Sequence, residues 1–195
     1  MKTTLRRQAF PTLKRIKQIT GDHCGPAVLA SLFSFVGRRL SQTAVVRSLR
    51  LKKKIKSHGV NVKGLAKATS IFGKGEAVFW QKREAKINDL NVLVNKYHQP
   101  VGVEWQGVFY EDEDEDSGHY SIVTEIDTQK GFLKLADPYK KFVGKDRKFK
   151  IKDFVKRWWD RNEIRGRTLT DRKMMFIVTP KSASFPKKLG MLKLS

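Results

Sequence analysis

Cysteine is almost absent from this sequence, because Cys24 is the single one among 195 residues. A lone thiol forms no internal disulfide and supplies no cluster of sulfurs for a structural zinc site. The sequence also lacks an apolar run near the ~20 residues that span a bilayer, and no apolar segment follows its basic start. These absences predict a chain without a transmembrane segment or signal peptide, in the reducing cytoplasm.

Internal repeats and long linkers are missing too, which favours a single domain at this length. The hydrophobic fraction of 39%, with 12 Phe and 4 Trp, is enough for a packed core. A chain of this size buries roughly 70% of its extended surface on folding. We expect one domain over residues 15–179, preceded by a basic lead-in at 1–14 and followed by a basic, loosely held tail at 180–195.

Acidic residues are scarce: 19 Asp and Glu stand against 41 Lys and Arg, which gives a net charge of +22. Such a field attracts polyanions such as nucleic acid, anionic membrane or acidic protein. The basic residues are spread along the whole chain. A basic solvated surface is therefore favoured over a specific nucleic-acid partner, which stays an alternative.

One acidic run, Glu111–Asp116, contains six of the 19 acidic residues and shortly precedes His119. We expect it to form a solvated loop. Two further roles stay open: a gate that attracts basic substrates and raises the pKa of His119, or a segment that folds back on the basic surface until a polyanion displaces it. Calcium binding is disfavoured, because the glycine and ligand spacing of an EF-hand loop are absent.

Helical signals dominate the first half of the chain, and alternating apolar residues predict strands in the second. Cys24 is expected to begin a helix, with Pro26 in its first turn and Gly37 after its end. Ser41 and Asn61 are expected to cap the next two helices. The other expected helices cover 88–97 and 151–159, and the expected strands cover 77–80, 101–105, 119–126, 131–136 and 174–178. Helices first and an antiparallel sheet second indicate the α+β class.

Cys24 is a candidate nucleophile, because the N-terminus of a helix favours a thiolate. Catalysis by cysteine also needs a base, a group that orients the base and donors for the oxyanion. The candidates are His119 at the start of a strand, Asp137 at the end of the next, and Gln18 six residues before Cys24. Each has an ordinary alternative, since single buried cysteines are commonly inert and Asp-Pro is a common turn. Together they favour nucleophilic catalysis.

The catalytic interpretation also predicts a strand register. If the turn between the two strands has an odd number of residues, Ile126 pairs with Phe132 and Ser121 faces Asp137. His119 then lies two residues along on the same face, at a diagonal distance of ~7 Å that a carboxylate can bridge. An even-numbered turn would place His119 and Asp137 on opposite faces.

A resemblance to a known family rests on four short motifs: Gln18, Cys24-Gly-Pro-Ala, Gly118-His119-Tyr120 and Asp137-Pro138. They resemble the C39 peptidases, which are papain-like cysteine proteases best known for removing double-glycine leaders from bacteriocin precursors. Further similar segments lie at 60–65, 99–105 and 154–158, so the resemblance covers roughly residues 15–178. It implies a papain-like fold with an N-terminal helical half packed on a C-terminal antiparallel sheet.

The resemblance also implies roles for the candidate residues. Cys24 would be the nucleophile, His119 the general base and acid, Asp137 the orienting group and Gln18 the oxyanion donor. The implied reaction is hydrolysis of a peptide or protein substrate through an acyl-enzyme, without a metal or organic cofactor. We also expect Trp105 and Gly118 to line the substrate cleft.

The sequence departs from the leader peptidases of membrane exporters, because it has no membrane region and no Gly-x-x-x-x-Gly-Lys-Ser/Thr phosphate loop. It therefore resembles a free-standing C39-like protein, to which double-glycine specificity does not automatically transfer. Two alternatives stay open: acyl transfer to an amine through the same thioester, and a non-catalytic basic protein that binds nucleic acid. The sequence does not determine the oligomeric state.

Overall fold

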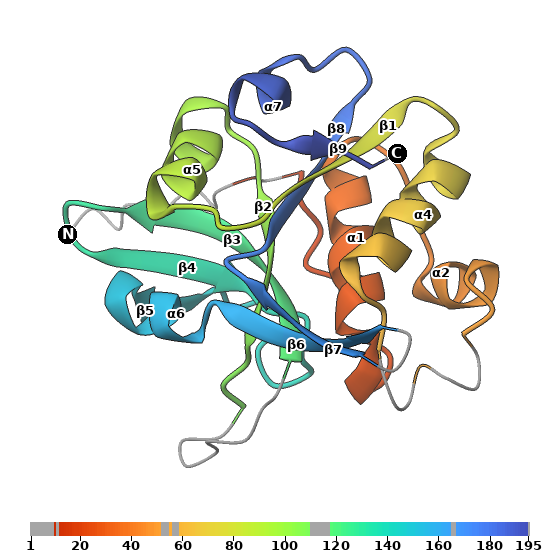
Figure 1. Ribbon diagram of the computed structural model, residues 1–195, viewed down its shortest axis with the longest axis horizontal. Helices are drawn as coiled ribbons and strands as arrows, with labels where there is room; N and C mark the ends of the chain where they lie inside the picture. Colours follow the sequence, from red (N-terminus) through yellow and green to blue (C-terminus); the bar gives the residue numbers. More distant parts are fainter. Residues whose placement is uncertain are drawn as a thin grey trace, which may run out of the picture.

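The computed structural model describes residues 10, 12–51, 55, 59–109, 118–164 and 167–194. The acidic run Glu111–Asp116, with the roles considered for it, lies outside these residues. A central sheet divides the molecule: Figure 1 shows α1, α2 and α4 on one side and α5 and α6 on the other. The helical segments are η1 (Gly21–His23), α1 (Cys24–Phe35), α2 (Gln42–Ser48), α4 (Val62–Gly73), α5 (Ile87–Asn91), the π-helical η2 (Val92–Lys96), α6 (Ile151–Arg157) and α7 (Phe185–Lys188).

The central sheet has seven strands in the order β5-β4-β3-β2-β8-β1-β9, and its described pairs are antiparallel. A separate hairpin of two strands follows α6. The strands of the sheet are β1 (Ala77–Lys82), β2 (Val101–Gln106), β3 (Gly118–Asp127), β4 (Phe132–Ala136), β5 (Arg147–Lys150), β8 (Met175–Pro180) and β9 (Leu192–Lys193); those of the hairpin are β6 (Trp159–Ile164) and β7 (Arg167–Arg172). The predicted α+β class is confirmed.

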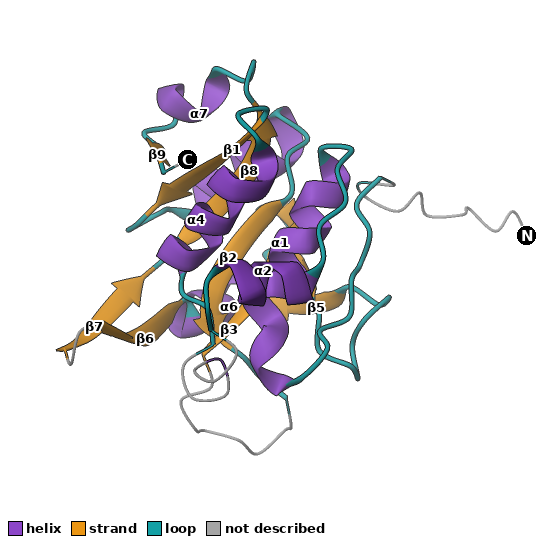
Figure 2. Ribbon diagram, turned by 90° about the vertical axis from the view of Figure 1, so that its right-hand side faces the viewer, coloured by secondary structure: helices purple, strands orange, loops and turns teal. Residues whose placement is uncertain are grey.

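Helix boundaries follow the capping signals of the sequence. The Ser41 side chain accepts a hydrogen bond from the backbone N–H of Ala44, and Asn61 accepts one from Gly64 at 2.9 Å. α1 begins at Cys24 as predicted, and Gly37 follows its end with a φ of 75°, which glycine adopts without strain. These caps set the ends of the three helices that cover one face of the sheet, as Figure 2 shows.

Two hydrophobic cores lie on opposite faces of the sheet. The first joins α1, α2 and α4 to β3 and β8. Ten of the 12 residues of α1 are buried, and five of these belong to this core. The second joins α5, η2 and α6 to β2, β3 and β4. A helix as apolar as α1 is stable only when it is buried on most of its surface. Cys24 is therefore the first residue of a buried helix.

The C-terminal segment and part of the lead-in are packed against the rest of the protein. The tail was expected to be loosely held, but β9 pairs with β1, Phe185 stacks on Tyr97 with ring centroids 4.4 Å apart, and Met191 is buried. In the lead-in, Leu13 is buried in the first core. The expectation of a loosely held tail was therefore wrong, because apolar residues of both segments are buried in the packed structure.

Candidate active site

Cys24 lies at the first residue of α1, directly after η1, and is buried. The residue after it explains how α1 can begin so close to the sheet. A Cβ at Gly25 would lie 3.2 Å from the Val60 carbonyl oxygen and 3.3 Å from the Tyr120 ring. Glycine therefore permits a close approach of α1 to β3, which brings Cys24 next to His119 at the start of that strand.

The register of β3 against β4 depends on a turn length and a bulge that the sequence did not predict. Ile126 pairs with Leu133 rather than Phe132, so the assumption of an odd-numbered turn was wrong. A bulge between Val123 and Glu125 then shifts the pairing by one residue, and Ile122 pairs with Ala136. The next pair along this register is Ser121 and Asp137, which is the alignment that the catalytic interpretation requires.

Asp137 and His119 are hydrogen-bonded in the structure. Asp137 is fully buried, and its Oδ1 accepts from His119 Nε2 at 2.9 Å and from the Tyr139 backbone N–H at 2.9 Å. Its Oδ2 accepts from Arg147 Nη1 at 2.8 Å. Burial alone would raise the pKa of Asp137, but the His119 and Arg147 contacts and the Tyr139 N–H lower it below its ordinary value.

Arg147 is a member of this site that sequence analysis missed. Besides its bond to Asp137, it donates from Nη2 to the Val108 carbonyl oxygen at 2.6 Å, and its guanidinium lies 3.7 Å from the centroid of Phe142. It belongs to a run of basic residues on β5, and nothing in that run distinguishes it. Only the pairing of β5 with β4 places Arg147 behind Asp137.

His119 interacts with both candidate partners. Burial alone would lower its pKa, but the hydrogen bond to Asp137, followed by the interaction with Cys24, raises it to about 9. The imidazolium form is therefore favoured beside the thiol at neutral pH. A histidine held in this way between a carboxylate and a thiol can take the thiol proton and keep it.

The side-chain amide of Gln18, which was expected to donate to the oxyanion, is hydrogen-bonded to backbone carbonyls in the segment before Cys24. Its Nε2 donates to the carbonyl oxygens of Thr20 and Gly21 at 2.8 Å each, and its Oε1 is buried without a partner. Both N–H groups are thus occupied, because η1 turns these two carbonyls toward the side chain. An oxyanion role for Gln18 requires one of these bonds to be exchanged.

Trp105 does not line a cleft, so this prediction was wrong. The alternation of β2 turns Trp105 with Val101 and Val103 into the second core, where it is fully buried and donates from Nε1 to Ser121 Oγ at 3.1 Å. Gly118, the other expected cleft residue, is exposed. A Cβ there would lie 2.5 Å from Asp160 Oδ1, so the backbone reaches this carboxylate only because the residue is glycine.

A buried acidic cluster borders the candidate site. Glu104 pairs with Tyr120 across β2 and β3, and its Oε1 accepts from the Tyr120 hydroxyl and from Asn162 Nδ2. Burial first, and the nearby Asp160 and Asp171 next, raise the pKa of Glu104 to about 7 against the Tyr120 hydrogen bond. The cluster was missed because it forms only when the β6–β7 hairpin folds onto β2.

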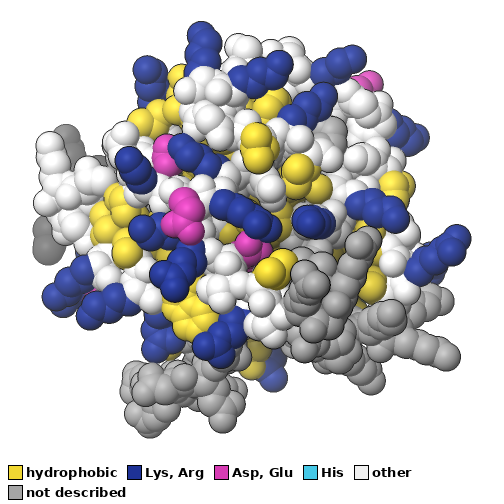
Figure 3. Space-filling model, in the orientation of Figure 1, with side chains coloured by type: hydrophobic (Ala, Val, Ile, Leu, Met, Phe, Trp, Pro, Cys, Tyr) yellow, Lys and Arg dark blue, Asp and Glu magenta, His cyan; other side chains and the backbone are white. Residues whose placement is uncertain are grey.

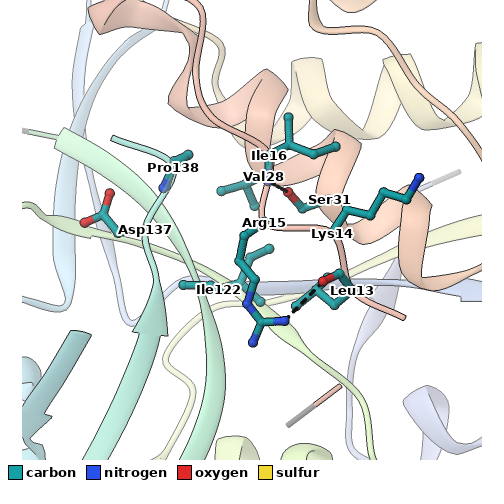
Figure 4. Close-up of a pocket in the computed structure, with 10 residues that line it drawn as sticks. Leu13, Lys14, Arg15, Ile16, Val28, Ser31, Ile122, Asp137 and Pro138 are labelled. Atoms are coloured by element: carbon teal, nitrogen blue, oxygen red, sulfur yellow. Dashed lines mark hydrogen bonds between the residues drawn. The ribbon is translucent and has the colours of Figure 1, made fainter. Parts of the chain in front are cut away.

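The hollow next to Asp137 is too small for a substrate. Its free volume of about 10 Å³ holds at most one water molecule, and Figure 4 shows the Asp137 carboxylate pointing away from Arg15 and Leu13. Arg15 is instead paired with Asp146 at 2.8 Å. Within the described part of the chain, no cluster of His, Cys, Asp and Glu could hold a metal ion, and no helix is long and apolar enough to cross a membrane.

Comparisons with known proteins agree with this architecture. The model of the Peptidase_C39 like family matches residues 10–164. Among solved structures, the fold is similar to the peptidase domain of Streptococcus ComA, a bi-functional ABC transporter involved in a quorum-sensing pathway. That similarity has a TM-score of 0.58 and 19% identity and covers 85% of this chain and 96% of that one. No curated protein matches the chain.

The fold is thus the papain-like α+β fold of a C39 peptidase domain, as the sequence predicted. Since the family model covers most of its length, the chain belongs to the Peptidase_C39 like family.

Proposed function

We propose that this protein is a cysteine peptidase in which Cys24 is the nucleophile, His119 the general acid and base, and Asp137 the orienting group. The observation that supports this most is the position of His119, which is hydrogen-bonded to Asp137 at 2.9 Å and lies close enough to Cys24 for the thiol to raise the pKa of the imidazole. The start of α1 adds its N-terminal dipole at the sulfur, which favours the thiolate.

In the proposed reaction, the Cys24 thiolate attacks the carbonyl carbon of a peptide bond, and the carbonyl electrons move onto oxygen. Protonated His119 then gives its proton to the amide nitrogen, the C–N bond breaks and the amine leaves. The acyl group stays on sulfur as a thioester. His119 next takes a proton from water, whose oxygen attacks the thioester and releases the carboxylic acid and the thiolate.

The surroundings of the site support these steps. Asp137 fixes the orientation of the imidazole and stabilises its positive charge, and Arg147 with the Tyr139 N–H fixes Asp137. The backbone N–H of Cys24 is a donor for the oxyanion, joined by Gln18 if its amide releases one of the two carbonyls it now contacts. We further propose that the exposed Gly118 borders the substrate path.

Turnover of a peptide library by the purified chain, followed by mass spectrometry, tests the proposal. Wild type should produce fragments with free carboxylic acids, and Cys24→Ala and His119→Ala should lose turnover by at least ~1000-fold while their circular dichroism is unchanged. A product with a new amide would mean that an amine resolves the thioester instead of water.

His98→Asn is a matched control for the histidine change. His98 is exposed and has a φ of 48°, a conformation that Asn tolerates. This variant should keep full turnover. Unchanged turnover in Cys24→Ala would contradict the proposal, because it would show that cleavage does not use the thiol.

A further inference from the structure

The β6–β7 hairpin has two faces of opposite character. Asp160 and Asp171 pair with each other and are buried near Glu104. Side chains alternate along a strand, so the neighbouring pairs lie on the outer face: Trp159 with Arg172 and Arg161 with Thr170. One face is thus acidic and turned inward, and the other is basic and aromatic.

The outer face forms one wall of a hollow of about 400 Å³ between the hairpin and α6. This volume is within the range of small-ligand sites. Six of the residues that line it are Lys156, Trp159, Arg161, Thr170, Arg172 and Lys173. Its described lining therefore contains four cations and a half-buried indole and no acidic side chain.

Three of the four cations in the hollow have no acidic partner among the described residues. The side chains of Lys156, Arg172 and Lys173 form no ion pair there, although acidic residues pair with Arg15, Arg38 and Lys82 elsewhere and Asp171 of the hairpin pairs with Arg83. Arg161 lies with its guanidinium 5.5 Å from the centroid of the Trp159 ring. Basic side chains also outnumber acidic ones over the face of the molecule drawn in Figure 3. The hollow is thus a local concentration of basic side chains on a surface that is basic more widely.

We propose that this hollow binds single-stranded nucleic acid, with a base stacked on Trp159 and the flanking phosphates paired with Lys156, Arg172 and Lys173. Aromatic rings that accept bases within a basic groove are the common device of proteins that bind single strands. A membrane surface fits less well, because it prefers protruding apolar side chains to a hollow. The proposal is independent of the peptidase chemistry, since none of these residues belongs to the candidate active site.

Fluorescence anisotropy with labelled single-stranded oligonucleotides of roughly 12 nucleotides tests the proposal. Lys156→Glu/Arg172→Glu should weaken binding by at least ~30-fold. It should also reduce the dependence of the logarithm of the association constant on log salt, whose slope is about −0.7 per phosphate contact for single strands. Trp159→Leu should weaken binding about tenfold, and Trp159→Phe should recover part of the loss.

Lys187→Glu/Lys188→Glu is the matched control. It makes the same change of charge at two exposed lysines of α7, which lies far from α6 in both ribbon views. This variant should weaken binding by less than about threefold, and Cys24→Ala should bind like wild type. Equal losses in the two charge-reversed variants, no effect of Trp159→Leu, or binding only to anionic vesicles would each overturn the proposal.

Discussion

Arg147→Met removes the cation behind Asp137 while keeping a long apolar side chain, and we expect it to lower stability by about 3 kcal/mol. The side chain makes a charge-assisted hydrogen bond to Asp137 Oδ2 at 2.8 Å and a second bond to the Val108 carbonyl oxygen at 2.6 Å. Such bonds contribute about 1.5–3 kcal/mol and about 1 kcal/mol respectively. The variant also leaves one oxygen of a fully buried carboxylate without its donor, as in a broken buried ion pair.

Urea unfolding at neutral pH is the assay, and the slope of the free energy against urea should stay unchanged. The low pKa of Asp137 contributes stability above its unfolded value near 3.8, and this contribution is lost as pH falls through the lower folded pKa. The difference between Arg147→Met and wild type should therefore shrink below about pH 4.

Lys150→Met is the control for Arg147→Met, because Lys150 is an exposed cation on the same strand. It should change the free energy of unfolding by less than about 0.5 kcal/mol. A loss below 1 kcal/mol in Arg147→Met would refute the assignment of Arg147 as the group that holds Asp137.

Two further changes test the neighbouring residues. Because burial raises the pKa of Glu104 to about 7, the contribution of this group to stability should fall by about 3 kcal/mol as pH rises from the unfolded pKa near 4.5 through 7. In urea titrations at pH 5 and 8, the loss of stability should therefore be smaller in Glu104→Gln than in wild type by about this amount. Trp105→Phe should lower stability by about 1–2 kcal/mol, because it removes the hydrogen bond to Ser121 and side-chain volume from the core. It should leave KM unchanged. A large rise in KM without a loss of stability would show instead that Trp105 lines the substrate cleft.

Local signals predicted much of the helical half. Ser41 and Asn61 are capping residues by chemistry alone, and the side-chain oxygen of each accepts a hydrogen bond from a backbone N–H in the first turn of its helix. The start of α1 at Cys24 follows from the apolar run behind it and from Pro26 in its first turn. Such features depend on residues within one helical turn of one another, so they can be predicted from the local sequence.

Features that depend on the pairing of strands could not be predicted from local sequence in this way. The bulge before Glu125 compensates for an even-numbered turn, and no residue in the strand marks it. The β6–β7 hairpin was missed, because its cross-strand pairs are not apparent from either strand alone. Arg147 acquires its role only from the pairing of β5 with β4.

The site itself was predicted in part. His119 and Asp137 were selected from their positions at strand ends, and the structure brings them together. The position of Trp105 was predicted wrongly, because it was assigned to the cleft from its place near a loop, whereas its side chain packs into the second core. Gln18 was selected from its spacing to Cys24, but the carbonyls of Thr20 and Gly21 compete for its amide, and this competition arises only in the folded loop.

The most direct test of the central claim is the rate of alkylation of Cys24 by iodoacetamide across pH, tracked by the mass of the intact protein. Cys24 is the single thiol, so every adduct reports on it. If His119 holds the thiol proton, labelling should be fast well below pH 8 and should slow in His119→Gln and, to a lesser extent, in Asp137→Asn. Labelling that follows an ordinary cysteine, with half-ionisation near about pH 8.5, and that neither variant changes would contradict the account.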